Sequence, residues 1–254
     1  MTVLASGVPE LPELFNWEYS LFGLPFLSWT VLAMLIAFSL TALFLLTAFN
    51  KQQIVPGKLQ LAGESVIGFV RTNIAEEVIG HEGHKYVAYL TTLFLLIFSF
   101  NFMEIFPGIA FPPTSHIAIP MFLAIITYLV YNFEGLRATG AKHYFGNILF
   151  PPGVPKFMYI LLTPIEFLSI LVIRPVTLTL RLTFNMLAGH LILSLVAVLC
   201  ATMWSASPLA LGLPFGVAIG TALTAFELFV AFLQAFIFTI LTALYIGGAI
   251  NPEH

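Results

Sequence analysis

The feature that most constrains this chain is a series of long apolar segments with almost no charged side chains. No Asp, Glu, Lys or Arg lies between Glu18 and Lys51, and about 20 apolar residues are enough to cross the hydrocarbon core of a bilayer. Of the 254 residues 8% are charged and 59% are hydrophobic, whereas ordinary soluble domains are about 25% charged. Such a chain cannot cover a water-facing surface. The sequence therefore predicts an integral membrane protein and excludes a soluble globular enzyme.

The rest of the composition excludes further classes of protein. Disordered chains are polar and highly charged, which is the opposite of this one. The formal net charge of −3 provides no basic field that would attract nucleic acid, so we expect no nucleic-acid partner. The single cysteine, Cys200, excludes a disulfide framework and a cysteine metal cluster. We expect neither a metal nor a cofactor.

The apolar segments predict an all-α membrane protein with about five membrane-crossing helices in one domain, 1–254. The predicted parts are an outer N-terminal arm, a first span, a helical hairpin and a second, longer hairpin, at 1–24, 25–49, 86–133 and 157–250. The segment 57–80 mixes polar and apolar residues. It fits either an amphipathic helix on the inner surface of the membrane or a solvated loop.

The last two apolar stretches, about 157–204 and 208–250, are longer than one crossing requires. A helix of about 45 residues measures roughly 68 Å, against a hydrocarbon core of about 30 Å. Two crossings in each stretch would need a polar turn, and an overhang into water would need a polar end; neither is evident. We therefore expect two steeply tilted helices, bent at Pro164 and Pro175 because proline can kink a helix.

The distribution of Lys and Arg predicts the orientation, because cytoplasmic loops carry an excess of these residues. The loop after the first span holds Lys51, Lys58, Arg71 and Lys85, and the loop after the third span holds Arg137, Lys142 and Lys156. The N-terminal arm and the loop at 107–115 hold none. With five crossings, the N-terminus is predicted outside, together with Glu10, Glu13 and Glu18, and the C-terminus inside.

Several ionisable residues fall within the predicted tilted hairpin, where charge is costly and usually functional. They are Glu166, Arg174, Arg181 and Glu227, with His190 beside them. Arg181 is the most informative, because a guanidinium cannot lose its proton and must find a counter-charge. The candidates are Glu166 and Glu227 of this chain, or an acid on another subunit.

Helical geometry sorts these residues by face. At about 100° per residue, Arg174, Arg181 and Asn185 fall within about 40° of one another, and His190 points to the opposite side. On the final helix one stripe carries Glu227, Gln234 and Tyr245. Asn185, Gln234 and Tyr245 could equally well serve to hold the helices together.

Other residues give weaker signals. The small residues Ala188 and Gly189 would allow another helix to approach closely. Glu104, near the outer end of its helix, could line a water path or reach outward to the membrane surface. His81 and His84 have a spacing that could begin a metal site, but no further ligand stands near them in the sequence, so we expect a solvated loop.

Two blocks of the sequence, 174–190 and 227–238, resemble subunit a of the F-type ATP synthase, and the resemblance extends over nearly the whole chain. Arg181 matches the essential arginine of that family, with Asn185 four residues further on. His190 and Glu227 match a pair whose acid and imidazole are exchanged in some members. Gln234 matches the family's glutamine near the arginine.

The sequence also departs from the family in two places. Thr183 and Phe184 stand where many members have Phe-Gly. Glu166 is not at the usual spacing from Arg181 for the acid that some members place on the same helix.

The resemblance implies a non-catalytic, proton-translocating stator subunit in the membrane part of a rotary ATP synthase, in a bacterial plasma membrane. It implies a ring of c subunits as partner, each with a membrane-buried carboxylate, together with b-type peripheral stalk subunits and the rest of the complex. Protons would reach and leave the ring through two offset half-channels, separated by Arg181. The implied proton pathway comprises Glu227, His190, Asn185 and Gln234. Tyr245 is added because it shares the stripe of Glu227 and Gln234, and Glu166 and Arg174 are candidates for the inner half-channel only because of their depth in the membrane.

Two other classes of protein were weighed from the residues alone. A haem- or quinone-binding respiratory subunit would need paired histidines deep in facing helices for bis-histidine ligation, and only His190 is so placed. A stand-alone ion channel or carrier would transport without partners. No glycine-rich phosphate-binding loop occurs, so any ATP chemistry is expected on other subunits.

Overall fold

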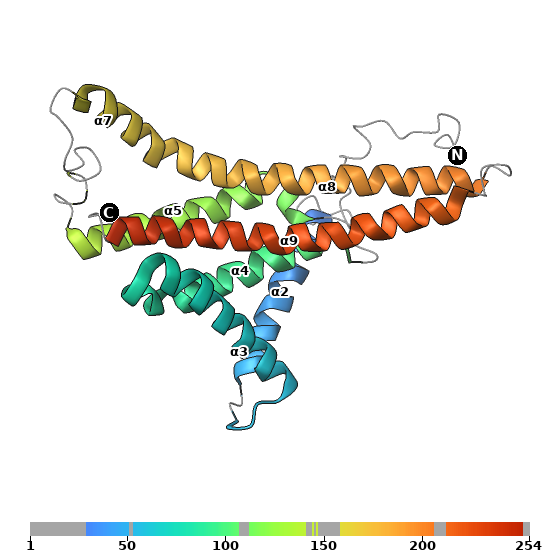
Figure 1. Cartoon of the computed structure of the whole chain (residues 1–254), viewed down its shortest axis with the longest axis horizontal. Coiled ribbons are helices and arrows are strands. Elements are labelled where there is room, and N and C mark those ends of the chain that lie inside the picture. Colours follow the sequence, from blue (N-terminus) through green and yellow to red (C-terminus); the bar gives the residue numbers. More distant parts are fainter. Residues whose placement is uncertain are drawn as a thin grey trace.

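The computed structural model describes residues 29–50, 53–106, 112–140, 144, 146, 158–205 and 212–250. Its regular structure over these ranges is helical, without a strand (Figure 1). Five helical stretches are long and apolar enough to cross a membrane: Thr30–Phe49, Lys58–Phe102, Ala118–Thr139, Leu161–Thr202 and Leu213–Ile250. The predicted all-α membrane fold with five crossings is therefore confirmed. The arm 1–24, with Glu10, Glu13 and Glu18, and the basic residues Lys51, Lys142 and Lys156 lie outside the described residues.

The first span forms α2 (Trp29–Phe49) and is followed by α3 (Lys58–Val70). The helical path continues through a π-helical segment, η2 (Arg71–Ile79), and a 3-10 segment, η3 (Gly80–Tyr86), into α4 (Val87–Phe102). Gly80 has φ +82°, a left-handed backbone that favours glycine, and the chain turns back on itself there (Figure 1). The predicted segment 57–80 is thus helical, and its position at the inner surface stays a prediction.

The core lies where α2, α4, α5 (Ala118–Thr139) and α9 (Leu213–Ile250) meet. Thr41 Oγ1 donates to Ser99 Oγ at 2.9 Å and joins α2 to α4. Rings from three elements pack together, with the Phe94 centroid 5.9 Å from Phe69 and 5.6 Å from Phe232. Because lipid gives no hydrophobic drive for one helix to meet another, this close packing holds the helices together.

The last part of the chain is a long antiparallel hairpin. One arm comprises α7 (Tyr159–Leu168), a π-helical turn η6 (Ser169–Ile173) and α8 (Arg174–Ser205), and the other arm is α9. The 21 residues of α2 span about 32 Å, close to the hydrocarbon thickness, whereas the 38 residues of α9 span about 57 Å. Figure 1 shows α2 running across the hairpin. If α2 stands upright in the membrane, the hairpin is steeply tilted, and this tilt stays a prediction.

The two predicted bends take different forms. Pro164 lies inside α7, which curves away from the line of α8 (Figure 1). Before Pro175 the helix widens into the π-helical turn η6. Proline has no N–H to donate and its ring collides with the carbonyl four residues earlier, and a wider turn is one way in which a helix accommodates this.

Candidate functional site

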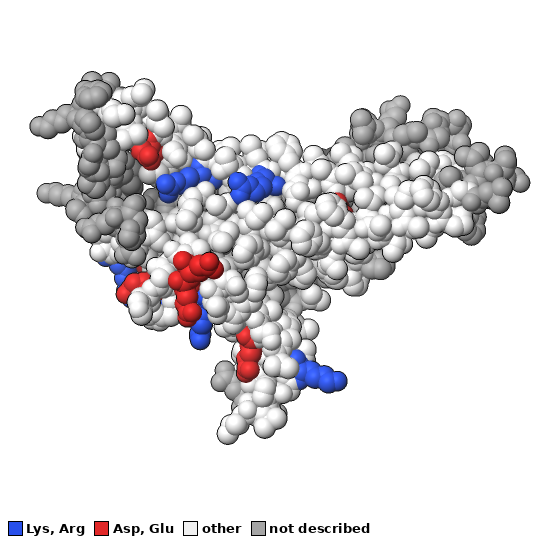
Figure 2. Space-filling view, in the orientation of Figure 1, with Lys and Arg blue, Asp and Glu red and all other residues white. Residues whose placement is uncertain are grey.

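Arg181 lies on a stripe of α8 that faces away from the rest of the chain. The exposed side chains of this outer stripe recur every three or four residues: Thr177, Arg181, Phe184, Ala188, Ile192, Leu195 and Leu199. That spacing is one face of a helix. The ion pair found among the described residues joins Lys85 to Glu82, and within those residues the Arg181 guanidinium has no hydrogen-bond or ion-pair partner. Figure 2 shows the basic side chains of α8 as blue patches on a largely uncharged face, with one red patch beside them.

Glu227 shows the opposite arrangement, because its carboxylate is buried against α8. The residue is 5% exposed. A Cβ atom built on Gly189 would lie 2.5 Å from Glu227 Oε2 and 2.9 Å from Oε1, so the carboxylate occupies space that only a glycine leaves open. Gly189 therefore allows a close approach, as predicted, and what approaches is an acid. Ala188 instead lies on the exposed outer stripe.

The polar pairs between α8 and α9 follow one another along the hairpin. One turn from Arg181, Asn185 Nδ2 lies 3.5 Å from Gln234 Oε1. Gly189 and Glu227 meet on one side of this pair, and Arg174 and Tyr245 meet on the other. The structure thus brings together across α8 and α9 the amide residues that the sequence singled out.

Tyr245 belongs with Arg174 rather than with Glu227. The Arg174 guanidinium carbon lies 5.0 Å from the centre of the Tyr245 ring, a cation–π contact. Tyr245 is 18 residues beyond Glu227, about 27 Å along a helix. These two members of the predicted proton pathway therefore lie at different levels of the hairpin.

His190 is half-buried. Its Nε2 lies 3.4 Å from Ser194 Oγ, one turn along α8. As the neighbour of Gly189 in the chain, it is next to the position that accommodates the Glu227 carboxylate.

Glu166 on α7 is also half-buried, and it makes no ion pair with an arginine of the described part of the chain.

Two further polar residues join the site from α4 and the turn after it. Glu104 is 6% exposed and Asn101 is 0% exposed, and Glu104 is close enough to Glu227 for the two carboxyl groups to interact electrostatically. Thr114 Oγ1 donates to Asn101 Oδ1 at 2.7 Å. The sequence left open whether Glu104 lines a water path or reaches outward. The available signal was its spacing of three from Asn101, which puts the two side chains on the same face of adjacent turns.

Buried polar atoms without a hydrogen-bond partner concentrate in this part of the protein. Four of the five such atoms among the described residues are Asn101 Nδ2, Glu104 Oε1, Glu227 Oε2 and Gln234 Nε2. Leaving a buried polar group unsatisfied costs about 1–3 kcal/mol, and ordered water is the usual solution. The arrangement is suited to holding a chain of water molecules.

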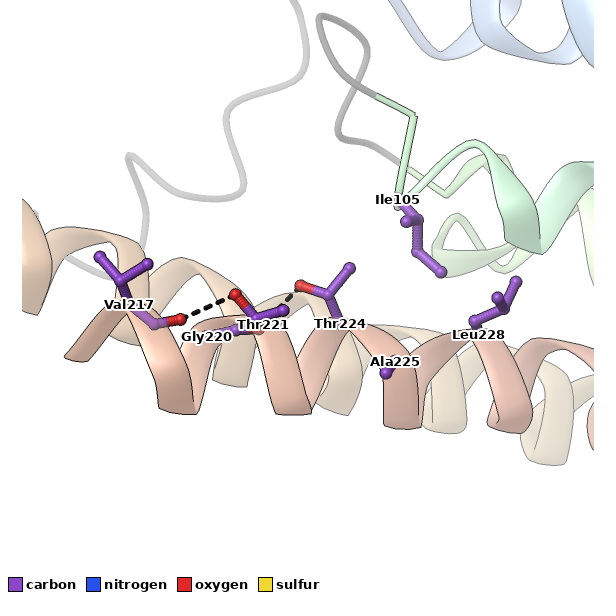
Figure 3. Close-up of a pocket in the computed structure, with 7 residues that line it drawn as sticks. All are labelled: Ile105, Val217, Gly220, Thr221, Thr224, Ala225 and Leu228. Atoms are coloured by element: carbon purple, nitrogen blue, oxygen red, sulfur yellow. Dashed lines mark hydrogen bonds between the residues drawn. The ribbon is translucent and has the colours of Figure 1, made fainter. Parts of the chain in front are cut away.

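A groove of about 520 Å³ opens along α9, beside the turn that follows α4 (Figure 3). Its walls are formed by Ile105, Val217, Gly220, Thr221, Thr224, Ala225 and Leu228. Ile105 and Leu228 directly follow Glu104 and Glu227 in the chain, and neither acid is among the lining residues. The hydroxyl groups of Thr221 and Thr224 bond to backbone carbonyls of their own helix, at 2.9 and 2.8 Å.

The described residues offer little that would hold a metal. No three His, Cys, Asp or Glu side chains gather there in a metal-binding arrangement. His81 and His84 are exposed in η3, where His84 Nδ1 lies 2.8 Å from the carbonyl of His81. The predicted solvated loop is thus an exposed 3-10 helical segment, in which His84 bonds locally to the backbone of His81.

Comparison with known proteins gives a consistent set of relatives. The family described as ATP synthase A chain matches residues 27–247. ATP synthase subunit a of Parafrankia sp. (strain EAN1pec) is 42% identical over 229 residues, 90% of this chain and 77% of the relative. The protein of the same name from Rhodococcus erythropolis is 37% identical over 261 residues, 100% of this chain and 94% of the relative. That from Magnetococcus marinus is 39% identical over 231 residues, 88% of this chain and 82% of the relative.

Proposed function

The chain belongs to the family of ATP synthase subunit a, and from this premise we propose how its residues move protons. It is a multi-pass membrane protein and the proton-translocating stator subunit of an F-type ATP synthase. We propose that its outer stripe on α8 faces a ring of c subunits, each with a buried carboxylate, and that b-type stalk subunits hold it in place. In this proposal ATP chemistry takes place on other subunits, and this chain is non-catalytic.

The observation that carries the proposal is the exposure of Arg181 without a counter-charge from its own described chain. A permanently charged guanidinium in a membrane must be neutralised. A carboxylate passing on a neighbouring ring would neutralise it. Arg181 in turn would favour the ionised form of that carboxylate and so promote release of its proton. The same fixed positive charge would repel a proton that moved directly from one half-channel to the other.

The outer half-channel is assigned to the buried polar residues around Glu227. Glu227, His190, Asn185 and Gln234 would conduct protons together with water, and Glu104 extends the predicted set. Imidazole and carboxyl groups can both take and release protons, and histidine does so near neutral pH. We assign the entrance of this half-channel to the groove lined by Ile105 and Leu228, the residues that directly follow Glu104 and Glu227.

The inner half-channel is assigned to Glu166 and Arg174, with Tyr245 beside Arg174. Two separate half-channels are required because a continuous path would be a leak. Moving one charge across 100 mV releases about 2.3 kcal/mol, so several protons are needed for one ATP. A rotating ring allows these protons to be used one at a time.

The orientation is proposed from the basic residues, as in the sequence analysis. The segments predicted to face the cytoplasm contain Lys58, Arg71, Lys85 and Arg137. The N-terminus would then lie outside and the C-terminus inside a bacterial plasma membrane.

The test is Arg181→Ala in the complete complex, assayed for ATP-driven proton pumping in membrane vesicles. We expect pumping to be abolished while the complex remains assembled. Arg71→Ala, which removes an exposed arginine of η2, is the matched control and should leave pumping unchanged. Normal pumping by the Arg181→Ala complex would refute the proposed role.

The two alternative classes are not favoured. Each relative named above is an ATP synthase subunit a rather than a channel, a carrier or a respiratory subunit. If the protein alone, without a ring, conducted protons in liposomes as fast as the whole complex does, the channel alternative would regain support.

A further inference from the structure

The π-helical turn η6 separates Glu166 from the two arginines of α8. In this turn the N–H of Arg174 bonds to the carbonyl of Ser169, five residues earlier. An α-helix would make the same bond over four residues. The turn therefore contains one residue more than a regular helix needs.

The extra residue changes the direction in which Glu166 points. In a regular helix, at about 100° per residue, the eight residues from Glu166 to Arg174 place the two about 80° apart, and Arg181 is about 60° from Glu166. With one residue absorbed by the π-helical turn, the effective spacings are seven and fourteen residues. Glu166 then points about 20° from Arg174 and about 40° from Arg181.

We propose that the π-helical turn η6 absorbs one extra residue and so places Glu166 on the same face as Arg174 and Arg181. In this proposal Tyr131 is the positioning residue that holds the turn. Figure 2 supports the alignment, because the red patch over α7 and the blue patches over α8 lie in a row on one face. Glu166 is the acidic residue of α7, and Arg174 and Arg181 are the basic residues of α8.

Tyr131 contacts η6 at the point where Pro175 leaves a backbone group without a partner. In a π-helix the Ile170 carbonyl would accept a hydrogen bond from the N–H of the residue five positions later. That residue is Pro175, and proline has no N–H. The Tyr131 hydroxyl donates to this carbonyl at 3.3 Å. Buried carbonyls are rarely left unpaired, so the bond from α5 fixes the turn in place.

Tyr131 also connects the turn to α9. It is 2% exposed, and its ring centre lies 5.7 Å from that of Tyr245, on which Arg174 rests. One side chain thus links the surplus turn, the last helix and the first arginine of α8. The functional consequence of this alignment rests on the inner half-channel proposed above.

The offset is tested by deleting single residues from the chain. Deletion of Val172, exposed within η6, should convert the π-helical turn into a regular one and leave Glu166 on the same face. We expect less than about a twofold loss of ATP-driven pumping in the complete complex, as for a neutral surface change. Deletion of Leu171 should behave in the same way. Deletion of Thr177, between the two arginines, should abolish pumping, because it turns Arg174 by about 100° relative to Arg181.

These deletions distinguish the offset from the proposed function. If either η6 deletion abolishes pumping or assembly as the Thr177 deletion does, the offset is refuted. Arg181→Ala, measured in parallel, reports on the proposed function alone: normal pumping there refutes that function whatever the deletions do.

The role of Tyr131 is tested with Tyr131→Phe, which removes the hydroxyl and keeps the ring. We expect a several-fold loss of pumping, and no loss for the matched control Tyr128→Phe. If Tyr131 acts by positioning Glu166, the loss should disappear in a Glu166→Gln background, whereas a general destabilisation would add to the effect of Glu166→Gln. Additive losses, or unchanged pumping by Tyr131→Phe, would overturn this role.

Discussion

Two polar regions lie along the α8–α9 hairpin. In one of them several buried polar atoms lack a hydrogen-bond partner, and in the other the polar side chains contact one another. The Glu227 region, defined as Asn101, Glu104, Glu227 and Gln234, contains four buried polar atoms without a described partner. In the Tyr131 region, defined as Tyr131, Asn132, Tyr144, Arg174 and Tyr245, the side chains bond to or stack on one another.

The difference separates a place for mobile water from a fixed frame. Polar atoms that protein leaves unsatisfied are suited to bind water, and a chain of water and carboxyl groups can pass protons. Polar atoms that already bond to protein hold helices at a set distance and angle. We therefore expect changes in the Glu227 region to alter proton flux. In the Tyr131 region we expect the loss of a bond that touches neither η6 nor Arg174, such as the bond from Tyr144 to Asn132, to alter stability alone.

Within these two regions, the largest effect is expected from Gly189→Ala. The new Cβ would lie 2.5 Å from Glu227 Oε2, so the carboxylate must leave its position. Overpacking of this kind costs about 1–3 kcal/mol of stability, and a displaced carboxylate could not pass protons in its place, so we expect a loss of pumping at least as large as that of Glu227→Gln. ATP-driven pumping per assembled complex measures the effect.

The matched control for this glycine is Gly248→Ala. A Cβ on Gly248 would meet nothing within 4 Å, so pumping should be unchanged. Equal losses in the two variants would show that any methyl group added to a glycine in the hairpin disturbs it, and the special status of the Glu227 region would be lost.

A smaller effect is expected from Glu227→Gln, which keeps the shape of the side chain and removes its proton exchange. Proton uptake should slow several-fold, while the amount of assembled complex stays the same. The exposed acid Glu77 supplies the control variant Glu77→Gln, which should pump normally. Rates for Glu227→Gln that equal those of the unmodified protein at every pH would contradict the assignment of this residue to a half-channel.

The smallest effect on flux is expected from Tyr144→Phe in the Tyr131 region. The Tyr144 hydroxyl donates to Asn132 Oδ1 at 3.0 Å, and losing such a bond costs about 1 kcal/mol of stability. The detergent-solubilised complex should aggregate at a lower temperature, with unchanged pumping per complex at moderate temperature. A loss of flux as large as that of Glu227→Gln would end the distinction between the two regions.

The membrane-spanning fold was predictable because a bilayer imposes a length on apolar segments. The long apolar stretches around Arg181 and Glu227 led directly to the tilted hairpin, and helical periodicity placed Asn185 beside Arg181. Resemblance to a family added the pairing of residues across helices, which periodicity within one helix cannot supply. Gln234 facing Asn185 is such a pairing.

The rest depended on contacts that a sequence pattern does not encode. Glu104 gained its importance from its proximity to Glu227, more than a hundred residues away in the chain. The π-helical turn before Arg174 changes the angular spacing that a regular helix predicts, so the direction of Glu166 could not be derived by counting residues. Tyr245 shares a stripe with Glu227, yet its contact with Arg174 assigns it to the other region.

The outer stripe of α8 has a consequence for friction in the proposed motor. Apart from Thr177 and Arg181 its side chains are apolar, and apolar contact is non-directional. A ring turning against such a surface meets nearly the same energy at every angle, as in a smooth bearing. In this proposal Arg181 supplies the angular preference, because the ring is held most strongly at the angles that bring one of its carboxylates beside the guanidinium.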